Sequence, residues 1–150
     1  MRAQQITALP QEINRSATEK KVKEALDKAR LYIQVGYHPG FEVSTTSGYN
    51  VVPRSQTNRF HSSTESAAIK NVDIERERME YVQRTIAAVY RLEKRERELI
   101  MTRWFGDEDK SDIAVYMDLC LSPATYYRIK SRALVKLALA LNLEVFKVID

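Results

Sequence analysis

Apolar residues recur every three or four positions over most of this chain, and that period predicts amphipathic helices. Within residues 11–35 the apolar stripe consists of Val22, Leu26, Ala29 and Ile33. A helix of this kind buries its stripe and leaves its charged side chains in solvent. The stripe therefore predicts one N-terminal helix. Its charged face, more basic than acidic, either stays solvated beside a partner helix or touches DNA phosphates.

Capping residues mark both ends of this helix. Ser16 suits the N-cap, and Glu19 three residues later would complete a capping box. Gly36 suits the position just past the C-terminus, where glycine tolerates a left-handed backbone. Residues 36–64 contain few charged residues and many Pro, Gly, Ser and Thr, and this composition predicts a linker or a docked loop.

A second apolar stripe predicts a long helix over residues 65–91. The stripe consists of Ile69, Val72, Met79, Val82, Ile86 and Val89, with Arg76 interrupting it. Its alternating steps of three and four are typical of a short heptad seam. Two interpretations stay open: the face packs into the core of its own chain, or it forms the seam of a homodimer.

A third helix is predicted over residues 92–106, with Leu99, Ile100, Trp104 and Phe105 as core positions. Few Gly and Pro occur in the chain, which favours long helices over tight turns. We therefore expect an all-α fold. Its expected parts are an N-terminal helical arm at 1–35, the linker or docked loop at 36–64, and a helical DNA-binding domain at 65–150.

A helix-turn-helix is predicted at residues 111–137. Ser111 suits the N-cap of a short helix that ends at Asp118. After a three-residue turn, Ser122 suits the next N-cap and Pro123 the first helical position, where a missing N–H costs nothing. The short connection is what a helix-turn-helix requires.

The second helix of this motif has an apolar side and a basic side. Its expected DNA-binding residues are Ser122, Ala124, Thr125, Tyr127, Arg128, Lys130, Ser131, Arg132 and Lys136. Residues near the start of a major-groove helix reach base edges, so Arg128 is expected to pair with guanine. Lys130, Arg132 and Lys136 fit phosphates better than bases. No acid occurs in residues 122–136, as a surface facing phosphates requires.

Composition permits this interpretation without demanding it. The formal net charge of +4 is mild, and many basic proteins bind no nucleic acid. A single cysteine excludes an internal disulfide and is typical of a reducing compartment. We see no signal peptide, and the longest apolar stretch, Ala133 to Leu143, is too short to span a bilayer. A cytoplasmic protein without a membrane partner is therefore expected.

Two segments resemble a known family of DNA-binding modules. These are L-E-K-R-E-R-E-L-I-M-T-R-W-F-G at residues 92–106 and L-S-P-A-T-Y-Y-R-I-K-S-R-A-L-V-K-L at residues 121–137. Together they resemble region 4 of bacterial sigma-70-type factors. Within that superfamily, S-x-x-T-Y-Y-R-I-K-x-R-A-L is similar to phage late transcription regulators of the ArpU/RinA type. The specific resemblance covers about residues 92–143.

The resemblance implies roles for individual residues. Arg95 and Arg103 match arginines that touch the DNA backbone, while Ala124 and Arg128 match positions that read bases. Tyr127 replaces a basic residue, so the promoter element of true sigma factors should not be read here. The sigma region that melts promoter DNA is not recognisable, which leaves promoter opening to another factor.

One further departure from the helix-turn-helix pattern is Tyr116, which stands where many such motifs carry Ala or Gly for close helix crossing. Either the helices cross more widely here, or the ring points aside.

The function expected from these patterns is a sequence-specific DNA-binding regulator. The family resemblance implies a phage or prophage origin, activation of late genes for packaging and lysis, and recruitment of the host RNA polymerase. Val135 and Leu139 would remain for a further surface, against the N-terminal half, a second subunit or the polymerase. One alternative is a small-terminase-like packaging protein. Another is a protein-interaction module whose basic helix faces an acidic partner.

No enzyme chemistry is predicted. His38, His61 and Cys120 lack the spacing of metal ligands, and a Cys–His pair would need the linker to fold onto the turn. Cys120 itself is expected to be partly buried. Paired carboxylates and a glycine-rich phosphate loop do not occur, so neither a metal nor another cofactor is expected.

Overall fold

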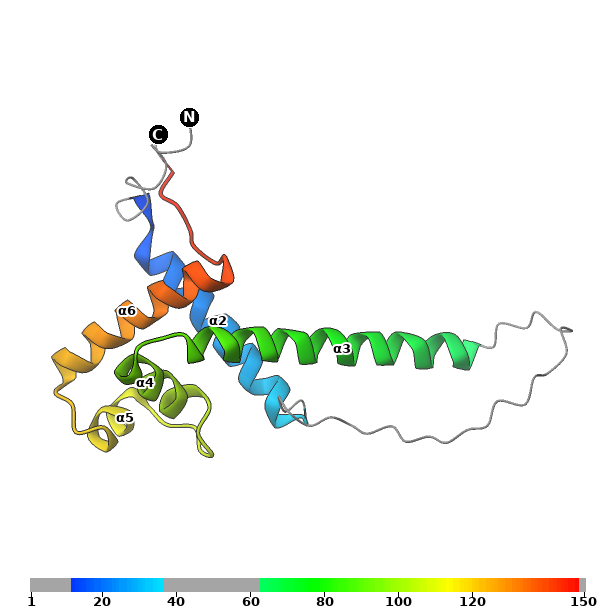
Figure 1. Ribbon diagram of the computed structural model, residues 1–150, viewed down its shortest axis with the longest axis horizontal. Helices are drawn as coiled ribbons and strands as arrows, with labels where there is room; N and C mark the ends of the chain where they lie inside the picture. The colour runs from blue at the N-terminus through cyan, green and yellow to red at the C-terminus, as the bar shows by residue number, and fades with distance from the viewer. Residues whose placement is uncertain (1–11, 37–62, 149–150) are drawn as a thin grey trace, which may run out of the picture.

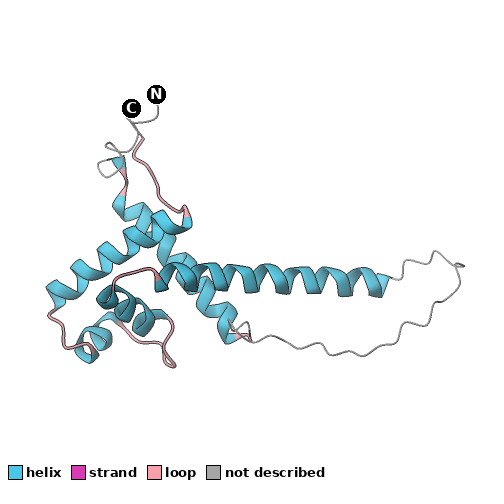
Figure 2. Cartoon of the chain, in the orientation of Figure 1, coloured by secondary structure: helices cyan, strands magenta, loops and turns pink. Residues whose placement is uncertain are grey.

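The computed structural model describes residues 12–36 and 63–148, and this part of the chain is built from helices and loops (Figures 1 and 2). The helices are α2 (Arg15–Gln34), α3 (Ser63–Tyr90), α4 (Lys94–Trp104), α5 (Asp112–Asp118) and α6 (Pro123–Leu141). The expectation of an all-α fold is confirmed. The linker or docked loop expected at 36–64 lies outside the described residues, apart from its two ends.

The expected single N-terminal helix is present as α2, but it begins earlier than its predicted cap. Asn14, not Ser16, is the N-cap, and its side chain accepts a hydrogen bond from the backbone N–H of Ala17. Asn14 is also held from outside the helix, because its N–H donates to the carbonyl of Val145 at 2.7 Å. Gly36 follows the end of α2 with a φ of +109°, as expected of a glycine terminator.

Helix α6 contacts each of the other four helices in the described part of the chain. Its buried residues Tyr126, Leu134 and Leu137 meet Leu26 of α2 and Leu99 of α4 within one hydrophobic core. An apolar side chain contributes roughly 1.5–3 kcal/mol when fully buried, so this contiguous core holds the helices together. The start of α6 nevertheless lies at an edge of the molecule, beside the short α5 (Figure 1).

Helix α3 divides into a packed half and a projecting half (Figure 1). Val82 and Val89, towards its C-terminus, are fully buried, whereas Ile69 and Val72 are 57% and 54% exposed. The predicted stripe therefore enters the core of its own chain over only half of its length. The other half leaves apolar side chains in solvent.

The two ends of the described chain are tied together. The N–H of Lys147 donates to the carbonyl of Glu12 at 2.7 Å, and Ile13 forms an isolated antiparallel bridge with Phe146. The hydroxyl of Thr18 also accepts a hydrogen bond from the N–H of Val145 at 2.9 Å. These bonds fix the start of α2 beside the segment that follows α6.

Candidate nucleic-acid interface

Local capping builds the predicted helix-turn-helix from α5 and α6. The Ser111 side chain accepts a hydrogen bond from the N–H of Ala114, and the Ser122 side chain accepts one from the N–H of Thr125. Pro123 occupies the start of α6, where its lack of an N–H costs nothing. Both caps predicted for the helix-turn-helix, Ser111 and Ser122, are confirmed. Ser122 also donates its own hydroxyl proton to Oγ1 of Thr125 at 2.8 Å, so both hydroxyls support the helix start.

The turn between the two helices depends on one left-handed residue. Cys120 has a φ of +54° and is exposed, which corrects the expectation that it is partly buried. The N–H of the following Leu121 reaches back to the carbonyl of Tyr116 at 2.9 Å. A left-handed backbone costs a residue with a side chain about 1 kcal/mol or more, so the turn is held by the packing of its neighbours.

The ring of Tyr116 packs edge-on against the ring of Tyr126, with 5.7 Å between their centroids. Tyr126 is fully buried and also meets Tyr127 edge-on, at 5.2 Å. Edge-to-face packing of this kind is favourable for aromatic rings. The bulky residue at this position is therefore accommodated as part of an aromatic cluster between α5 and α6.

A carboxylate at the start of α5 fixes α5 to α6 and α4. Oδ1 of Asp112 accepts hydrogen bonds from Tyr126 Oη at 2.6 Å and from Arg103 Nε at 3.2 Å. Lys130 Nζ donates to both oxygens of Asp112, at 2.8 and 2.9 Å. We call these four residues the Asp112 cluster. It sets the position of α6 relative to α5, and therefore the direction in which the exposed side of α6 points.

Burial and the neighbouring positive charges have opposite effects on the pKa of Asp112. Burial alone would raise the pKa of this carboxyl, but the hydrogen bonds from Lys130 and Tyr126 and the charge of Arg103 outweigh burial and lower it. The pKa of Tyr126 is raised, first by burial and then by its hydrogen bond to the Asp112 carboxylate. At neutral pH the cluster therefore contains an ionised carboxylate surrounded by donors.

The outer side of α6 presents a line of exposed residues. Ala124, Arg128 and Arg132 follow one another at intervals of four, and all three are exposed. We call them the exposed strip. Tyr127 is 49% exposed beside it, and α6 contains no acidic residue. An acid-free helix face at the edge of the molecule matches the expected position of a base-reading helix.

Not every expected contact residue is available to DNA. Lys130 is only 7% exposed, because Asp112 accepts its ammonium protons and the rings of Trp104, Tyr126 and Tyr127 surround it at 5.6 to 5.8 Å. The expectation that Lys130 touches a phosphate is therefore wrong. A cation held this way supports the fold, since a buried charge requires a partner.

Other expected contact residues already have partners within the chain. Lys136 donates to Glu96 at 2.8 Å and to Glu93 at 3.2 Å, and the bond to Glu96 is the main reason that the pKa of Lys136 is raised. Ser131 donates to Oε1 of Glu19 at 2.5 Å. Arg103 belongs to the Asp112 cluster, whereas Arg95 is exposed on α4.

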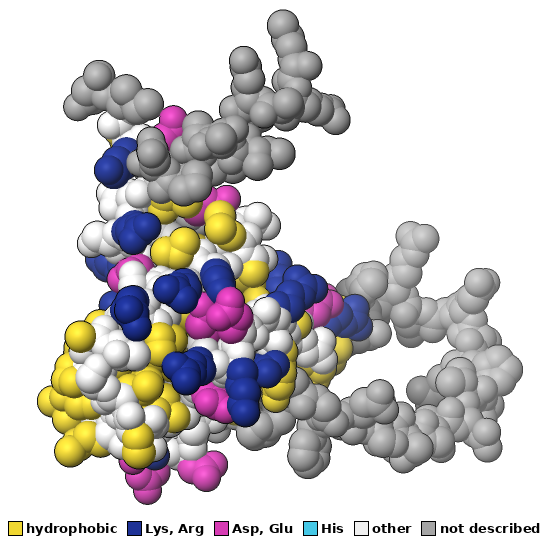
Figure 3. Space-filling model, turned by 60° about the vertical axis from the view of Figure 1, so that its left-hand side comes forward, with side chains coloured by type: hydrophobic (Ala, Val, Ile, Leu, Met, Phe, Trp, Pro, Cys, Tyr) yellow, Lys and Arg dark blue, Asp and Glu magenta, His cyan; other side chains and the backbone are white. Residues whose placement is uncertain are grey.

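The sequence left open whether the charged face of the N-terminal helix touches DNA phosphates, and it did not single out Arg15. A groove between α2 and α6 is lined by Arg15, Arg128, Ser131, Arg132, Val135 and Lys136. We call it the basic groove. Figure 3 shows dark-blue Lys and Arg side chains that gather on one face of the molecule with magenta Asp and Glu side chains among them, while apolar side chains border them at the lower left. Only the contact of α2 with α6 brings Arg15 to the groove, 113 positions before Arg128 in the chain.

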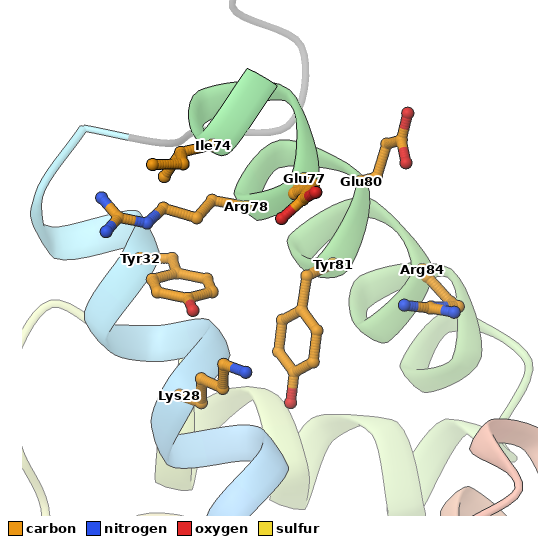
Figure 4. A pocket seen from close by; sticks show the side chains of 8 residues that line it. All are labelled: Lys28, Tyr32, Ile74, Glu77, Arg78, Glu80, Tyr81 and Arg84. Atoms are coloured by element: carbon orange, nitrogen blue, oxygen red, sulfur yellow. The ribbon is translucent and has the colours of Figure 1, made fainter. Parts of the chain in front are cut away.

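A second pocket lies between α2 and α3 (Figure 4). Lys28 Nζ lies 4.7 Å from the centroid of the Tyr81 ring and 5.7 Å from that of Tyr32. Tyr81 donates its hydroxyl proton to the carbonyl of Ala25 at 3.2 Å. Burial is the main reason that its pKa is raised. Lys, Arg and Glu side chains share the lining, so it favours no single charge, and its contacts tie α3 to α2.

The described residues contain no group of three or more His, Cys, Asp or Glu that could hold a metal ion. His38 and His61 lie outside the described residues. No helix in the described ranges is both long and apolar enough to cross a membrane.

Two relatives place the chain among phage proteins. It is 34% identical to the phage-related protein Lin1259/Lin1739 of Listeria innocua over 139 residues, which cover 93% of this chain and 96% of the relative. The chain belongs to this family of phage-related proteins. It is also 31% identical to Protein Gp66 of Listeria phage A118 over 100 residues, which cover 67% of this chain and 68% of that protein.

The phage origin implied by the sequence resemblance is thus confirmed for this phage-related protein. No family model and no solved structure matches it.

Proposed function

We propose that this phage-related protein binds duplex DNA in a sequence-specific manner and regulates phage late genes, as regulators of the ArpU/RinA type do. The single observation that carries the proposal is the exposed strip, which is free of acids and lies at the start of a helix that a three-residue turn joins to α5. In this arrangement Ala124 and Arg128 would face base edges in the major groove, while Arg132 would face the backbone.

The contacts within the chain support recognition by a rigid helix. The Asp112 cluster and the capping bonds of Ser122 hold the start of α6 in place, so little ordering would be needed when DNA binds. We also propose that the chain acts by binding rather than by catalysis. Activation would then add a contact with the host RNA polymerase near the promoter.

Replacing Arg128 tests the proposal most directly. Protection of phage DNA by the purified protein would first identify the bound site, and binding to that duplex would then be measured by fluorescence anisotropy. We expect Arg128→Ala to lose about 1–3 kcal/mol of affinity and to relax specificity at one base pair. Lys70→Ala, on the projecting half of α3, is the matched control because it also removes an exposed cation. An equal loss for both variants, or a uniform loss on every sequence, would contradict base reading by Arg128.

A small-terminase-like packaging protein is a second candidate. The exposed Ile69 and Val72 on the projecting half of α3 favour it, because packaging assemblies need surfaces between subunits. The mass of the protein in solution distinguishes the candidates. A ring of many subunits would support the packaging role, and a monomer or dimer would support the regulator.

A further inference from the structure

The basic groove shares Arg128 and Arg132 with the exposed strip and extends beyond the helix-turn-helix to Arg15 of α2. One wall comes from α6, with Arg128, Arg132 and Val135, and the other from Arg15 at the first position of α2. The N–H of Asn14 donates to the carbonyl of Val145, and the N–H of Lys147 donates to the carbonyl of Glu12, so the segment after α6 holds the start of α2 in this position. The groove is therefore a fixed feature of the fold.

Three of the cations at the groove differ from the lysines of α6 in having no carboxylate partner. Among residues 12–36 and 63–148, no carboxylate lies within 4.0 Å of the side-chain nitrogens of Arg15, Arg128 or Arg132. Lys136, at the end of the groove, is offset by Glu93 and Glu96. A surface with three uncompensated arginines attracts a phosphate-bearing ligand, and guanidinium groups bind phosphate in bidentate fashion.

We propose that the basic groove binds the sugar-phosphate backbone next to the bases read by α6, and that Arg15 is a DNA contact outside the helix-turn-helix. This rests on the proposed DNA-binding function. Arg132 lies eight residues beyond Ala124, or about 12 Å along the helix at 1.5 Å per residue. Arg132 and Arg15 line the same groove as Arg128, so a backbone that flanks the bases faced by Ala124 and Arg128 would meet both of them.

Glu19 opposes this binding from the rim of the groove. Its Oε1 accepts the hydroxyl proton of Ser131, a groove residue, at 2.5 Å. A carboxylate in this position repels an incoming phosphate, while an amide would keep a hydrogen-bonding oxygen without the charge. The groove therefore contains both a favourable and an unfavourable charge, and the two can be removed separately.

Two substitutions with opposite expected signs test the groove. The probe is a labelled 30-base-pair duplex of random sequence, because backbone contacts do not require a specific site. With the full-length chain, we expect Arg15→Ala to weaken binding about threefold to tenfold and to reduce the salt slope by about 1. Glu19→Gln should strengthen binding at low salt. Lys21→Ala, an exposed cation on the same helix, should change binding less than Arg15→Ala does.

The outcomes separate the groove from the wider proposal. If the duplex binds and Arg132→Ala weakens it, but Arg15→Ala behaves like Lys21→Ala, the groove proposal is overturned and the DNA-binding function stands. If the wild-type chain binds neither this duplex nor phage DNA, the proposed function itself fails. Should Arg15→Ala unfold, Arg15→Gln and Glu19→Gln provide the same test, provided that their thermal midpoints match that of the wild type.

Discussion

Removing the carboxylate of Asp112 should destabilise the fold mainly by leaving Lys130 without a partner. In Asp112→Asn, the ammonium of Lys130 would stay 7% exposed beside an amide, and the hydrogen bonds from Tyr126 and Arg103 would lose their charged acceptor. Breaking a buried ion pair from one side costs about 3–5 kcal/mol. The Asp112 side chain is 26% exposed, so solvent screens part of this, and we expect a loss of about 2–4 kcal/mol.

The partner variant should behave differently. Lys130→Met keeps a long side chain among the rings of Trp104 and Tyr126, and it leaves Asp112 with its remaining donors. We expect a loss below about 1.5 kcal/mol, because apolar replacement of a buried ion often costs little. In the double variant the orphaned ammonium is gone. The loss of unfolding free energy in the double variant should therefore be smaller than the sum of the two single losses by at least about 1 kcal/mol.

Urea unfolding measures these free energies, and Trp104 provides the signal. It is the single tryptophan of the chain and is 2% exposed, next to Lys130. The DNA-binding assay adds an independent readout: Lys130→Met should keep the wild-type affinity and salt dependence, as expected of a lysine that does not touch phosphate. A loss of unfolding free energy below about 0.5 kcal/mol for Asp112→Asn, or strictly additive losses in the double variant, would refute this account of the cluster.

Two further predictions concern the same motif. The folded-state pKa of Asp112 is lowered, so its contribution to stability is complete above the unfolded value of about 3.9 and is lost as the pH falls through the folded value. The gap in unfolding free energy between wild type and Asp112→Asn should accordingly be constant near neutral pH and narrow below about pH 4; a gap that widens in acid would contradict this. Cys120→Gly should raise stability by up to about 1 kcal/mol, because glycine adopts the positive φ without strain, whereas Cys120→Val should lower it. Thermal midpoints in the opposite order would show that the turn is not strained.

Local signals predicted much of the helix-turn-helix. The caps at Ser111 and Ser122 and the terminator at Gly36 depend on bonds within a few residues, so sequence spacing identifies them. The predicted cap at Ser16 was wrong because Asn14, two residues earlier, is also a favoured N-cap residue, and sequence spacing alone did not distinguish the two. Asn14 is held by the carbonyl of Val145, 131 positions away, and no pattern around residue 16 shows that contact.

The candidate site was predicted less completely, because whether a cation is exposed or paired depends on which carboxylates it meets on other helices. Lys130 lies four residues after the buried Tyr126 and three before the buried Ala133, so it borders the apolar stripe. That spacing hints at burial, but the decisive fact is a carboxylate at Asp112 on another helix. No sequence pattern around Arg15 predicts its place in the basic groove, because only the packing of α2 on α6 brings it there.

The cations of α6 divide by chemistry as well as by position. Its two lysines, Lys130 and Lys136, are paired with the carboxylates of Asp112 and Glu96, where a compact ammonium fits between helices. Its two arginines, Arg128 and Arg132, extend into solvent on the outer side. Because a planar guanidinium presents a fixed pair of donors to guanine or phosphate, whereas an ammonium acts as a point charge, an exchange of Arg for Lys on the outer side would preserve the charge and weaken the proposed recognition. A net charge summed over the helix hides this division, since half of its positive charge is paired with carboxylates of the fold and only the other half is available for the proposed DNA contacts.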